Sequence, residues 1–283
     1  MKPLRIVMQG GLGNQLFSYF AGANLAREES REIILDISDL GFAETHRNFE
    51  LEKFNLPYPY NLKKKKRYKN LYRVNNLLEK FSTINRYRKI YHSSVVGYDP
   101  MLDEINSVRT LKGYFQTWKY VQNFDQTYDL FVESTWTNDM KNLAEAEEPI
   151  ILHIRRGDYL NLDGSFGLLS ETFFKNAIIL ARKENFCGSI WIFTDSPNLI
   201  SNEFLSEING RIVFEPRGVS PAEIISVMSL GKAIIISNST FSWWSAYMNQ
   251  NRCIIAPSKW FRGLEDPLDL YPPSWKIVES VWQ

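Results

Sequence analysis

Short apolar runs alternate with helical segments along the second half of the chain, and this alternation constrains the fold most. The runs lie at residues 150–154, 189–193, 212–214, 233–236 and 253–256, the last of which we expect to be the final strand. Between them, residues 171–184 have helical spacing after an N-cap at Ser170, and Ser220-Pro221-Ala222-Glu223 starts a helix through Leu230 with a capping box. Residues 243–249 should also be helical. This pattern predicts a parallel sheet with helices on both faces.

The N-terminal part opens with a related unit. Residues 5–9 predict a strand, 10–14 a glycine-rich turn, 15–29 a helix and 33–36 a second strand. Residues 46–105 are rich in Lys, Arg, Tyr and Asn, which predicts short helices and loops without a clean strand, and 111–116 favour a strand containing a glycine. The composition becomes polar and acidic over 137–148. We therefore expect two domains, 1–148 and 149–283.

The bulk composition excludes several classes of protein. With 283 residues, 44% hydrophobic and 23% charged, the chain can bury a full core, and its net charge of +1 gives no argument for nucleic-acid binding. Only Cys187 and Cys253 are present, and the three histidines are widely separated, so no disulfide framework or metal cluster is predicted. No apolar window is long enough to span a bilayer or to act as a signal peptide, which makes the cytoplasm the expected location. The oligomeric state stays open.

Polar side chains follow three of the predicted strands. His153-Ile154-Arg155-Arg156-Gly157-Asp158 offers two guanidinium groups, which bind phosphate without a metal, and Asp195 offers a carboxylate suited to a base edge or ribose hydroxyls. The third loop offers Asn238, Ser239, Thr240 and Ser242 before a helix start, where backbone N–H groups bind anions. Since parallel strands end at one edge, these loops together favour a diphosphate site. A structural Arg–Asp pair and simple N-capping by Thr240 or Ser242 are the alternatives.

The glycine-rich turn offers a second place where a ligand can approach the backbone. Gly11, Gly13 and the later Asp36 match part of the dinucleotide-binding fingerprint, but Leu16 stands where the third glycine belongs. Asn14 and Gln15 add two amides that can contact sugar hydroxyls or a leaving phosphate.

Two further clusters have less specific readings. The run Lys63-Lys64-Lys65-Lys66-Arg67 is typical of a solvated loop, and contact with an anionic membrane surface is the alternative. Trp243 and Trp244 are adjacent on a predicted helix, so at most one can face a ligand, and core packing is favoured for at least one.

Four motifs together resemble the bacterial α-1,2-fucosyltransferases of glycosyltransferase family 11. They are Gly10-Gly11-Leu12-Gly13-Asn14-Gln15-Leu16-Phe17, Leu111-Lys112-Gly113-Tyr114-Phe115-Gln116, His153-Ile154-Arg155-Arg156-Gly157-Asp158 and Ser237-Asn238-Ser239-Thr240-Phe241-Ser242-Trp243-Trp244. The resemblance extends from about residue 5 to about residue 260. It implies a GT-B fold, with two Rossmann-like domains facing across a cleft. It also implies GDP-β-L-fucose as donor, the O2 of a terminal galactose as acceptor, inversion without a metal ion or other cofactor, and a role in O-antigen or other surface-glycan synthesis.

The resemblance also implies roles for individual residues. It assigns His153 to guanine, Arg155 to the diphosphate, Asp195 to guanine or ribose, and Ser239, Thr240 and Ser242 to the phosphate region. Phe241, in the same loop, is expected to bind substrate as well. Asn14 resembles an asparagine that positions the leaving group in protein O-fucosyltransferases. Many members carry a second acidic residue after the position of Asp195, where this chain has Ser196-Pro197.

We expect Arg155 and Asn14 to be catalytic. No Asp-x-Asp motif for a metal ion is present, and a preorganised cation at Arg155 can stabilise the departing diphosphate instead. Arg156 and Asp158 are expected to support the site, the aspartate by fixing an arginine rotamer, and Gly11, Gly13 and Gln15 complete the predicted substrate-binding set. Asp36, Asp39, Glu44 and His46 are acid–base candidates in the N-terminal half, but no pattern places one at the acceptor, so no base is assigned.

Three alternatives remain open from the sequence. An NAD(P)-dependent oxidoreductase would use the glycine turn, and a non-catalytic glycan-binding protein would use the tryptophans. A fucosyltransferase of another linkage or acceptor is the nearest alternative, because acceptor choice would lie in the region 40–130.

Overall fold

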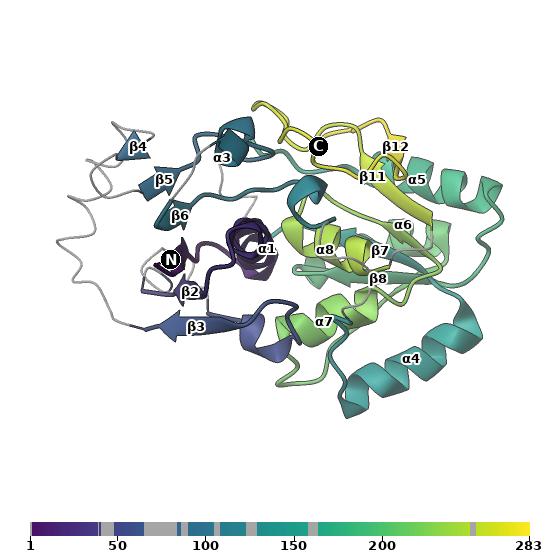
Figure 1. Cartoon of the computed structure of the whole chain (residues 1–283). Coiled ribbons are helices and arrows are strands. Elements are labelled where there is room, and N and C mark those ends of the chain that lie inside the picture. Colours follow the sequence, from purple (N-terminus) through teal and green to yellow (C-terminus); the bar gives the residue numbers. More distant parts are fainter. Residues whose placement is uncertain are drawn as a thin grey trace. The chain divides into compact units, whose positions relative to one another are not determined.

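The computed structural model describes residues 2–38, 40, 48–64, 84–85, 90–104, 108–122, 129–157, 164–249 and 253–283. The chain forms two compact units (Figure 1). Unit 1 comprises Met1–Asp129 and Pro267–Pro272, and unit 2 comprises Leu130–Asp266 and Pro273–Gln283. The late segment of unit 1 is bonded into it, because the Asp269 carboxylate pairs with the ammonium of Lys119 at 2.7 Å.

In unit 1, the described strands form a sheet of six in the order β3-β2-β1-β6-β5-β4. All neighbours are parallel except β4 and β5. The elements are β1 (Leu4–Val7), α1 (Leu12–Glu28), β2 (Ile33–Asp36), η1 (Leu51–Lys53), β3 (Tyr60–Lys63), β4 (Ile84–Asn85), β5 (Ile90–His92), α3 (Pro100–Glu104), β6 (Thr110–Lys112) and η2 (Trp118–Tyr120). The strand–helix–strand opening is confirmed, and α1 packs on β1 and β2.

Two expectations for unit 1 need correction. Helix α1 already begins at Leu12, so Asn14 lies in its first turn and not in a loop before it. The expectation of no clean strand within 46–105 is wrong, because β3 and β5 lie there. The pattern missed β3 because it is an edge strand whose side chains are exposed or half-buried, so its sequence Tyr-Asn-Leu-Lys carries no apolar run.

In unit 2, the described strands form a second sheet, fully parallel, in the order β12-β11-β10-β7-β8-β9. Its elements are α4 (Thr135–Glu147), β7 (Ile150–Ile154), α5 (Glu171–Lys183), β8 (Ile190–Thr194), η4 (Pro197–Leu199), α6 (Asn202–Ile208), β9 (Gly210–Ile212), α7 (Pro221–Met228), β10 (Ala233–Ile235), α8 (Thr240–Met248), β11 (Cys253–Pro257) and β12 (Lys276–Val278). The predicted alternation is confirmed, and all five residues of the central strand β7 are buried.

Smaller differences in unit 2 concern its caps and its last strand. The capping box of Ser220 and Glu223 is present, whereas Ser170 occupies the N-cap of α5 without a side-chain hydrogen bond. Strand β11 is not the final strand, because β12 pairs beside it. Helix α5 packs over β7, β10, β11 and β12, and its aromatic residues Phe173 and Phe174 enter the core on that face.

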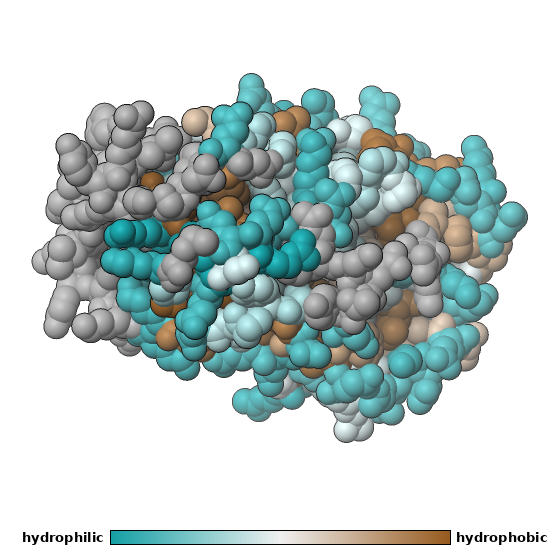
Figure 2. All heavy atoms as spheres, in the orientation of Figure 1, coloured by the Kyte–Doolittle hydropathy of each residue, from teal (hydrophilic) through white to brown (hydrophobic). Residues whose placement is uncertain are grey.

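Unit 2 begins before α4, so the division falls at Leu130 and not near Glu148. The polar stretch predicted as a boundary is a surface helix, whose exposed side chains form a largely hydrophilic area at the lower right of Figure 2. Its end is anchored in unit 2. The Glu147 carboxylate accepts hydrogen bonds from Ser189 Oγ at 2.5 Å and Trp191 Nε1 at 2.7 Å.

Candidate active site

The strand order of unit 2 reverses between β7 and β10. From β7 the chain proceeds to β8 and β9 on one side, and then returns to β10, β11 and β12 on the other. A ligand site in an open α/β sheet is found at the carboxyl ends of the strands where the order reverses. Strands β8, β7 and β10 are neighbours, so the three predicted loops share this edge, as the sequence indicated.

Asp195 connects two of these loops. Its Oδ2 lies 3.0 Å from Arg155 Nη1, and its Oδ1 accepts the backbone N–H groups of Arg156 at 3.0 Å and Gly157 at 3.1 Å. Burial alone would raise the pKa of this carboxyl group. The two N–H donors and the Arg155 charge outweigh burial and hold the pKa of Asp195 below its usual value.

These contacts give Asp195 a role within the chain. Its carboxylate holds Arg155 and the backbone of Arg156 and Gly157 in place, and the expected contact with a base or ribose stays a prediction. The structure shows an Arg–Asp pair that the sequence did not indicate, between Arg155 and Asp195. Asp158 lies outside the described residues, so its expected pairing stays a prediction.

Gly157 is a site residue that the sequence reasoning did not single out. A Cβ atom there would lie 2.5 Å from Asp195 Oδ2, which is closer than Cβ atoms come to such neighbours in proteins. The residue type therefore leaves room for the carboxylate that holds Arg155. A glycine directly after the arginine pair was the available signal.

His153 lies on β7 at the point where the strand order reverses. Its Nδ1 is 2.9 Å from Ser237 Oγ, and its ring centroid is 5.7 Å from that of Phe241. Burial, and secondarily the nearby charge of Arg155, lower the pKa of His153 from 6.5 to about 3. A neutral imidazole at physiological pH suits hydrogen bonding to a neutral nucleobase and not binding of an anion.

The buried state of His153 predicts how the stability of the protein depends on pH. The folded state keeps the imidazole neutral, whereas the unfolded chain binds a proton below its ordinary pKa of 6.5. Stability is therefore fully present above pH 6.5 and is lost as the pH falls toward 3, with a slope from this group of up to about 1.4 kcal/mol per pH unit. Urea unfolding at a series of pH values should show a smaller slope for His153→Gln than for the wild type. Equal slopes would contradict the assignment.

The third loop is mainly a helix cap. Ser239 is the N-cap of α8, and its Oγ accepts the N–H of Phe241. Ser242 is fully buried, and its Oγ donates to the carbonyls of Ser237 and Ser239. Capping therefore comes from Ser239 and not from Thr240 or Ser242, and the position of Ser242 argues against phosphate contact. Thr240 and Phe241 are the partly exposed members of the loop.

Asn238 and Arg156 stabilise the loops around the site. Asn238 Nδ2 donates to the carbonyls of Phe166, Gly167 and Trp260 at 3.0–3.1 Å. Arg156 is buried, its Nη1 donates to the Leu169 carbonyl at 2.7 Å, and burial lowers its pKa. The supporting role expected for Arg156 stays a prediction.

The two adjacent tryptophans belong to the core. Trp243 and Trp244 have no exposed surface. The Trp243 ring stacks on that of Tyr247, with ring centroids 4.9 Å apart, and its centroid lies 5.4 Å from that of Trp275. Neither can serve as the sugar platform considered from the sequence.

In unit 1, the glycine-rich segment has its strict backbone requirement at Gly10. Gly10 has φ +69°, a left-handed conformation that favours glycine, whereas Gly11 is the extended N-cap of α1 and Gly13 is buried within that helix. Gln15 is also fully buried. Its Nε2 donates to the carbonyls of Gly10 and Asn48, and its Oε1 accepts the Glu50 N–H. The structure thus uses Gln15 to hold the segment together and does not present it to a ligand.

Asn14 is half-buried and accepts a hydrogen bond that the sequence reasoning missed. Its Oδ1 lies 2.9 Å from Nε2 of Gln116, the last residue of the motif at 111–116. Nothing in the spacing of the two residues, which are 102 positions apart, indicates this pair.

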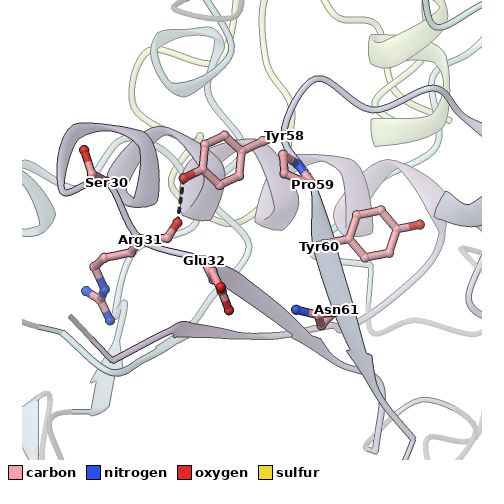
Figure 3. Close-up of a pocket in the computed structure, with 7 residues that line it drawn as sticks. All are labelled: Ser30, Arg31, Glu32, Tyr58, Pro59, Tyr60 and Asn61. Carbon is pink, nitrogen blue, oxygen red and sulfur yellow. Dashed lines mark hydrogen bonds between the residues drawn. The ribbon is translucent and has the colours of Figure 1, made fainter.

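A cavity of about 350 Å³ lies elsewhere in unit 1 (Figure 3). Its lining is Ser30, Arg31, Glu32, Tyr58, Pro59, Tyr60 and Asn61. Within it, the Tyr58 hydroxyl donates to the Arg31 carbonyl at 2.5 Å. Because these residues precede or begin β2 and β3, the cavity is at the amino ends of the strands, away from the edge where α/β sheets bind ligands.

The sequence comparison decides the family. The profile described as Glycosyl transferase family 11 matches residues 110–275, more than half of the chain. The chain belongs to glycosyltransferase family 11. The family-11 region includes the three loops of unit 2 and also Gln116.

Relatives of this family-11 protein include two from Escherichia coli. The O-antigen biosynthesis glycosyltransferase WbnK is 28% identical and covers 90% of this chain and 94% of its own length. An alpha-1,2-colitosyltransferase is 27% identical and covers 96% and 98%. A galactoside 2-alpha-L-fucosyltransferase from Caenorhabditis elegans is 22% identical over 58% of this chain and 50% of its own.

A solved structure agrees in fold with this glycosyltransferase. A mutant of Arabidopsis thaliana FUT1 in complex with GDP superposes with a TM-score of 0.50 and 13% identity, covering 90% of this chain and 70% of the other. With the two parallel-sheet α/β units, this confirms the GT-B class.

The oxidoreductase alternative also loses its acidic residue. The buried Asp36 carboxylate lies 2.5 Å from Arg5 Nε and 2.9 Å from Lys63 Nζ, and it accepts the Ser38 N–H. Burial alone would raise the pKa of Asp36, but these partners together lower it. The carboxylate that would bind a ribose in a dinucleotide site is thus occupied by its own chain.

Lys65, Lys66 and Arg67 lie outside the described residues, so membrane contact by the basic run 63–67 stays a prediction.

The described residues contain neither a metal-binding cluster nor a membrane-spanning helix. No three His, Cys, Asp or Glu side chains within the described ranges lie together as a group able to hold a metal ion. Over the same ranges, no helix has the length and apolar character needed to cross a membrane.

Proposed function

We propose that this family-11 glycosyltransferase moves L-fucose from GDP-β-L-fucose to the O2 of a terminal galactose, with inversion, in O-antigen or other surface-glycan synthesis. The observation that carries the proposal is Arg155, held by Asp195 at the reversal of strand order in unit 2. The names of the relatives support an α-1,2 linkage, a galactoside acceptor and an O-antigen role.

The proposed reaction breaks the bond between fucose C1 and a β-phosphate oxygen and forms the bond from C1 to the acceptor O2. Negative charge develops on the departing GDP, and a preorganised guanidinium at Arg155 stabilises it. We assign His153 to the guanine, Thr240 to the phosphate region, and Asn14 to a substrate oxygen that gains charge. The bond between O2 and its proton also breaks, and we assign this proton to an oxygen of the departing diphosphate and name no side chain as the base.

Colitose is the second candidate for the transferred sugar, because the colitosyltransferase relative covers nearly the whole chain. Colitose is fucose without the hydroxyl at C3. A site that hydrogen-bonds that hydroxyl rejects the deoxy sugar by about 10⁴-fold or more, since its buried polar groups would be left unpaired.

Product analysis tests the proposal. The full chain is incubated with GDP-fucose, or with the 3-deoxy donor, and a panel of terminal galactosides, and the products are examined by mass spectrometry and linkage analysis. We expect α-1,2-linked fucose on galactose. Preference for the 3-deoxy donor would identify colitose as the transferred sugar, and a product with another linkage would correct the acceptor atom. If NADH but not GDP raised the thermal stability of the protein, an oxidoreductase would replace the proposed transferase.

Metal independence is a separate expectation of the role given to Arg155. Transfer should continue at the same rate in excess EDTA, because the guanidinium supplies the positive charge at the diphosphate. Initial rates with EDTA, and after addition of magnesium or manganese, check this. A rate abolished by EDTA and restored by either metal would show that Arg155 does not carry this role alone.

A further inference from the structure

The side chain of Gln116 is the most informative group outside the site of unit 2. It is only 7% exposed, and its backbone N–H is fixed by a 2.7 Å hydrogen bond to the Val96 carbonyl. Its Nε2 donates to Asn14 Oδ1 at 2.9 Å, while its Oε1 is buried without a hydrogen-bond partner in the described part of the chain. Buried carbonyl oxygens of this kind are uncommon and call for an explanation.

Asn14 and Gln116 lie at the carboxyl edge of the sheet of unit 1. Asn14 is in the first turn of α1, which follows β1, and Gln116 follows β6. Strands β1 and β6 are parallel neighbours, so the hydrogen bond joins the segments after their two carboxyl ends. This is the edge at which open α/β sheets present functional side chains.

The backbone before Gln116 is strained. Phe115 is fully buried and has φ +50°, which is a left-handed conformation. This conformation costs a bulky residue about 1–3 kcal/mol, and residues in it are found most often at functional sites. Its ring packs edge-on against Tyr120, with centroids 6.0 Å apart. The packing of Phe115 thus stabilises the turn that places Gln116 within hydrogen-bond distance of Asn14.

The direction of the hydrogen bond sets what Asn14 can offer to a ligand. A carboxamide has one donor end and one acceptor end, and a half-turn exchanges them. Because Gln116 donates to Oδ1 of Asn14, the NH2 group of Asn14 is on the other side, next to Gly10. A Cβ atom added to Gly10 would lie only 2.5 Å from Asn14 Nδ2. The reverse arrangement would bury an unpaired N–H of Gln116, and unpaired N–H groups are rarer than unpaired carbonyls.

We propose that Gln116 is a positioning residue that fixes the Asn14 amide with its NH2 group as the donor to substrate. The inference rests on the proposed role of Asn14 at a substrate oxygen that gains negative charge. Gln116 itself touches no reacting atom and acts through Asn14.

Gln116→Leu tests the inference, because it removes the donor together with the unpaired carbonyl and conserves most of the volume. We expect kcat to fall about tenfold, equivalent to one misplaced hydrogen bond, with KM for GDP-fucose within about twofold and no loss of thermal stability. In an Asn14→Ala background the same substitution should change kcat no further, since its effect passes through Asn14. Gln122→Leu, at an exposed glutamine of unit 1, is the matched control and should retain wild-type kcat.

The outcomes separate three cases. Unchanged kcat in Gln116→Leu, or an equal loss in both backgrounds, would overturn the positioning role. Full kcat in Asn14→Ala would overturn the role of Asn14 and this inference with it, while fucose transfer by the chain would still stand. Should Gln116→Leu fold poorly, Gln116→Glu gives the second test. Its carboxylate attracts the NH2 group of Asn14 and turns Oδ1 toward the substrate, so a loss of kcat that disappears in the Asn14→Ala background supports the inference.

Discussion

Replacement of Arg155 by lysine should lower kcat by about 100-fold or more, the scale of one lost preorganised donor at a developing charge. The substitution keeps the positive charge but loses the planar fork that matches phosphate oxygens. It also weakens the contact with Asp195, which holds the guanidinium at the carboxyl end of β7. The measurement is kcat and KM for GDP-fucose, with the loss expected mainly in kcat.

Arg182→Lys is the matched control for this prediction, because Arg182 lies in the last turn of α5, which leads to the amino end of β8, and its Nη1 donates to the Phe186 carbonyl. Its kcat should stay at the wild-type value. A folded Arg155→Ala variant with near-normal transfer would remove Arg155 from the mechanism.

The substitution Gly157→Ala should also reduce kcat strongly, although it adds only a methyl group. The new Cβ would lie 2.5 Å from Asp195 Oδ2, the oxygen that pairs with Arg155, so the carboxylate has to move. Misplacement of a catalytic group by about 1 Å can cost about 100-fold. We expect a loss between about tenfold and 100-fold in kcat, with thermal stability much less affected.

Gly263→Ala provides the comparison within unit 2. A Cβ at Gly263 would meet Ser165 at 3.5 Å, an ordinary contact, so this variant should transfer fucose at the wild-type rate. If the two alanine variants have the same kcat, Asp195 does not need its observed position to orient Arg155.

The architecture of unit 2 could be predicted because its strands are buried on both faces. Strand β7 reads as an unbroken apolar run up to His153, and the capping residues Ser220 and Glu223 mark a helix start in the sequence itself. Edge strand β3 was missed because its half-exposed side chains impose no such pattern. The sequence pattern therefore predicts the strands that are buried and misses those that are half-exposed.

The site could be predicted in its location but not in its pairings. Parallel strands carry their loops to one edge, so the arginine pair, Asp195 and the serine loop could be grouped. Which aspartate holds Arg155 depends on the register of β7 against β8, which places Ile154 beside Thr194. The hydrogen bond between Gln116 and Asn14 likewise depends on the pairing of β1 with β6.

The late segment Pro267–Pro272 has a consequence for exchanging halves between members of the family. It belongs to unit 1, where the Leu268 carbonyl accepts the Tyr98 N–H and the Asp269 carbonyl accepts the Thr117 hydroxyl. A chimera joined at a single point near residue 130 would supply unit 1 with a foreign version of this segment. To transplant unit 1 intact, residues 267–272 should travel with the N-terminal half, so the graft requires three junctions in the gene and not one.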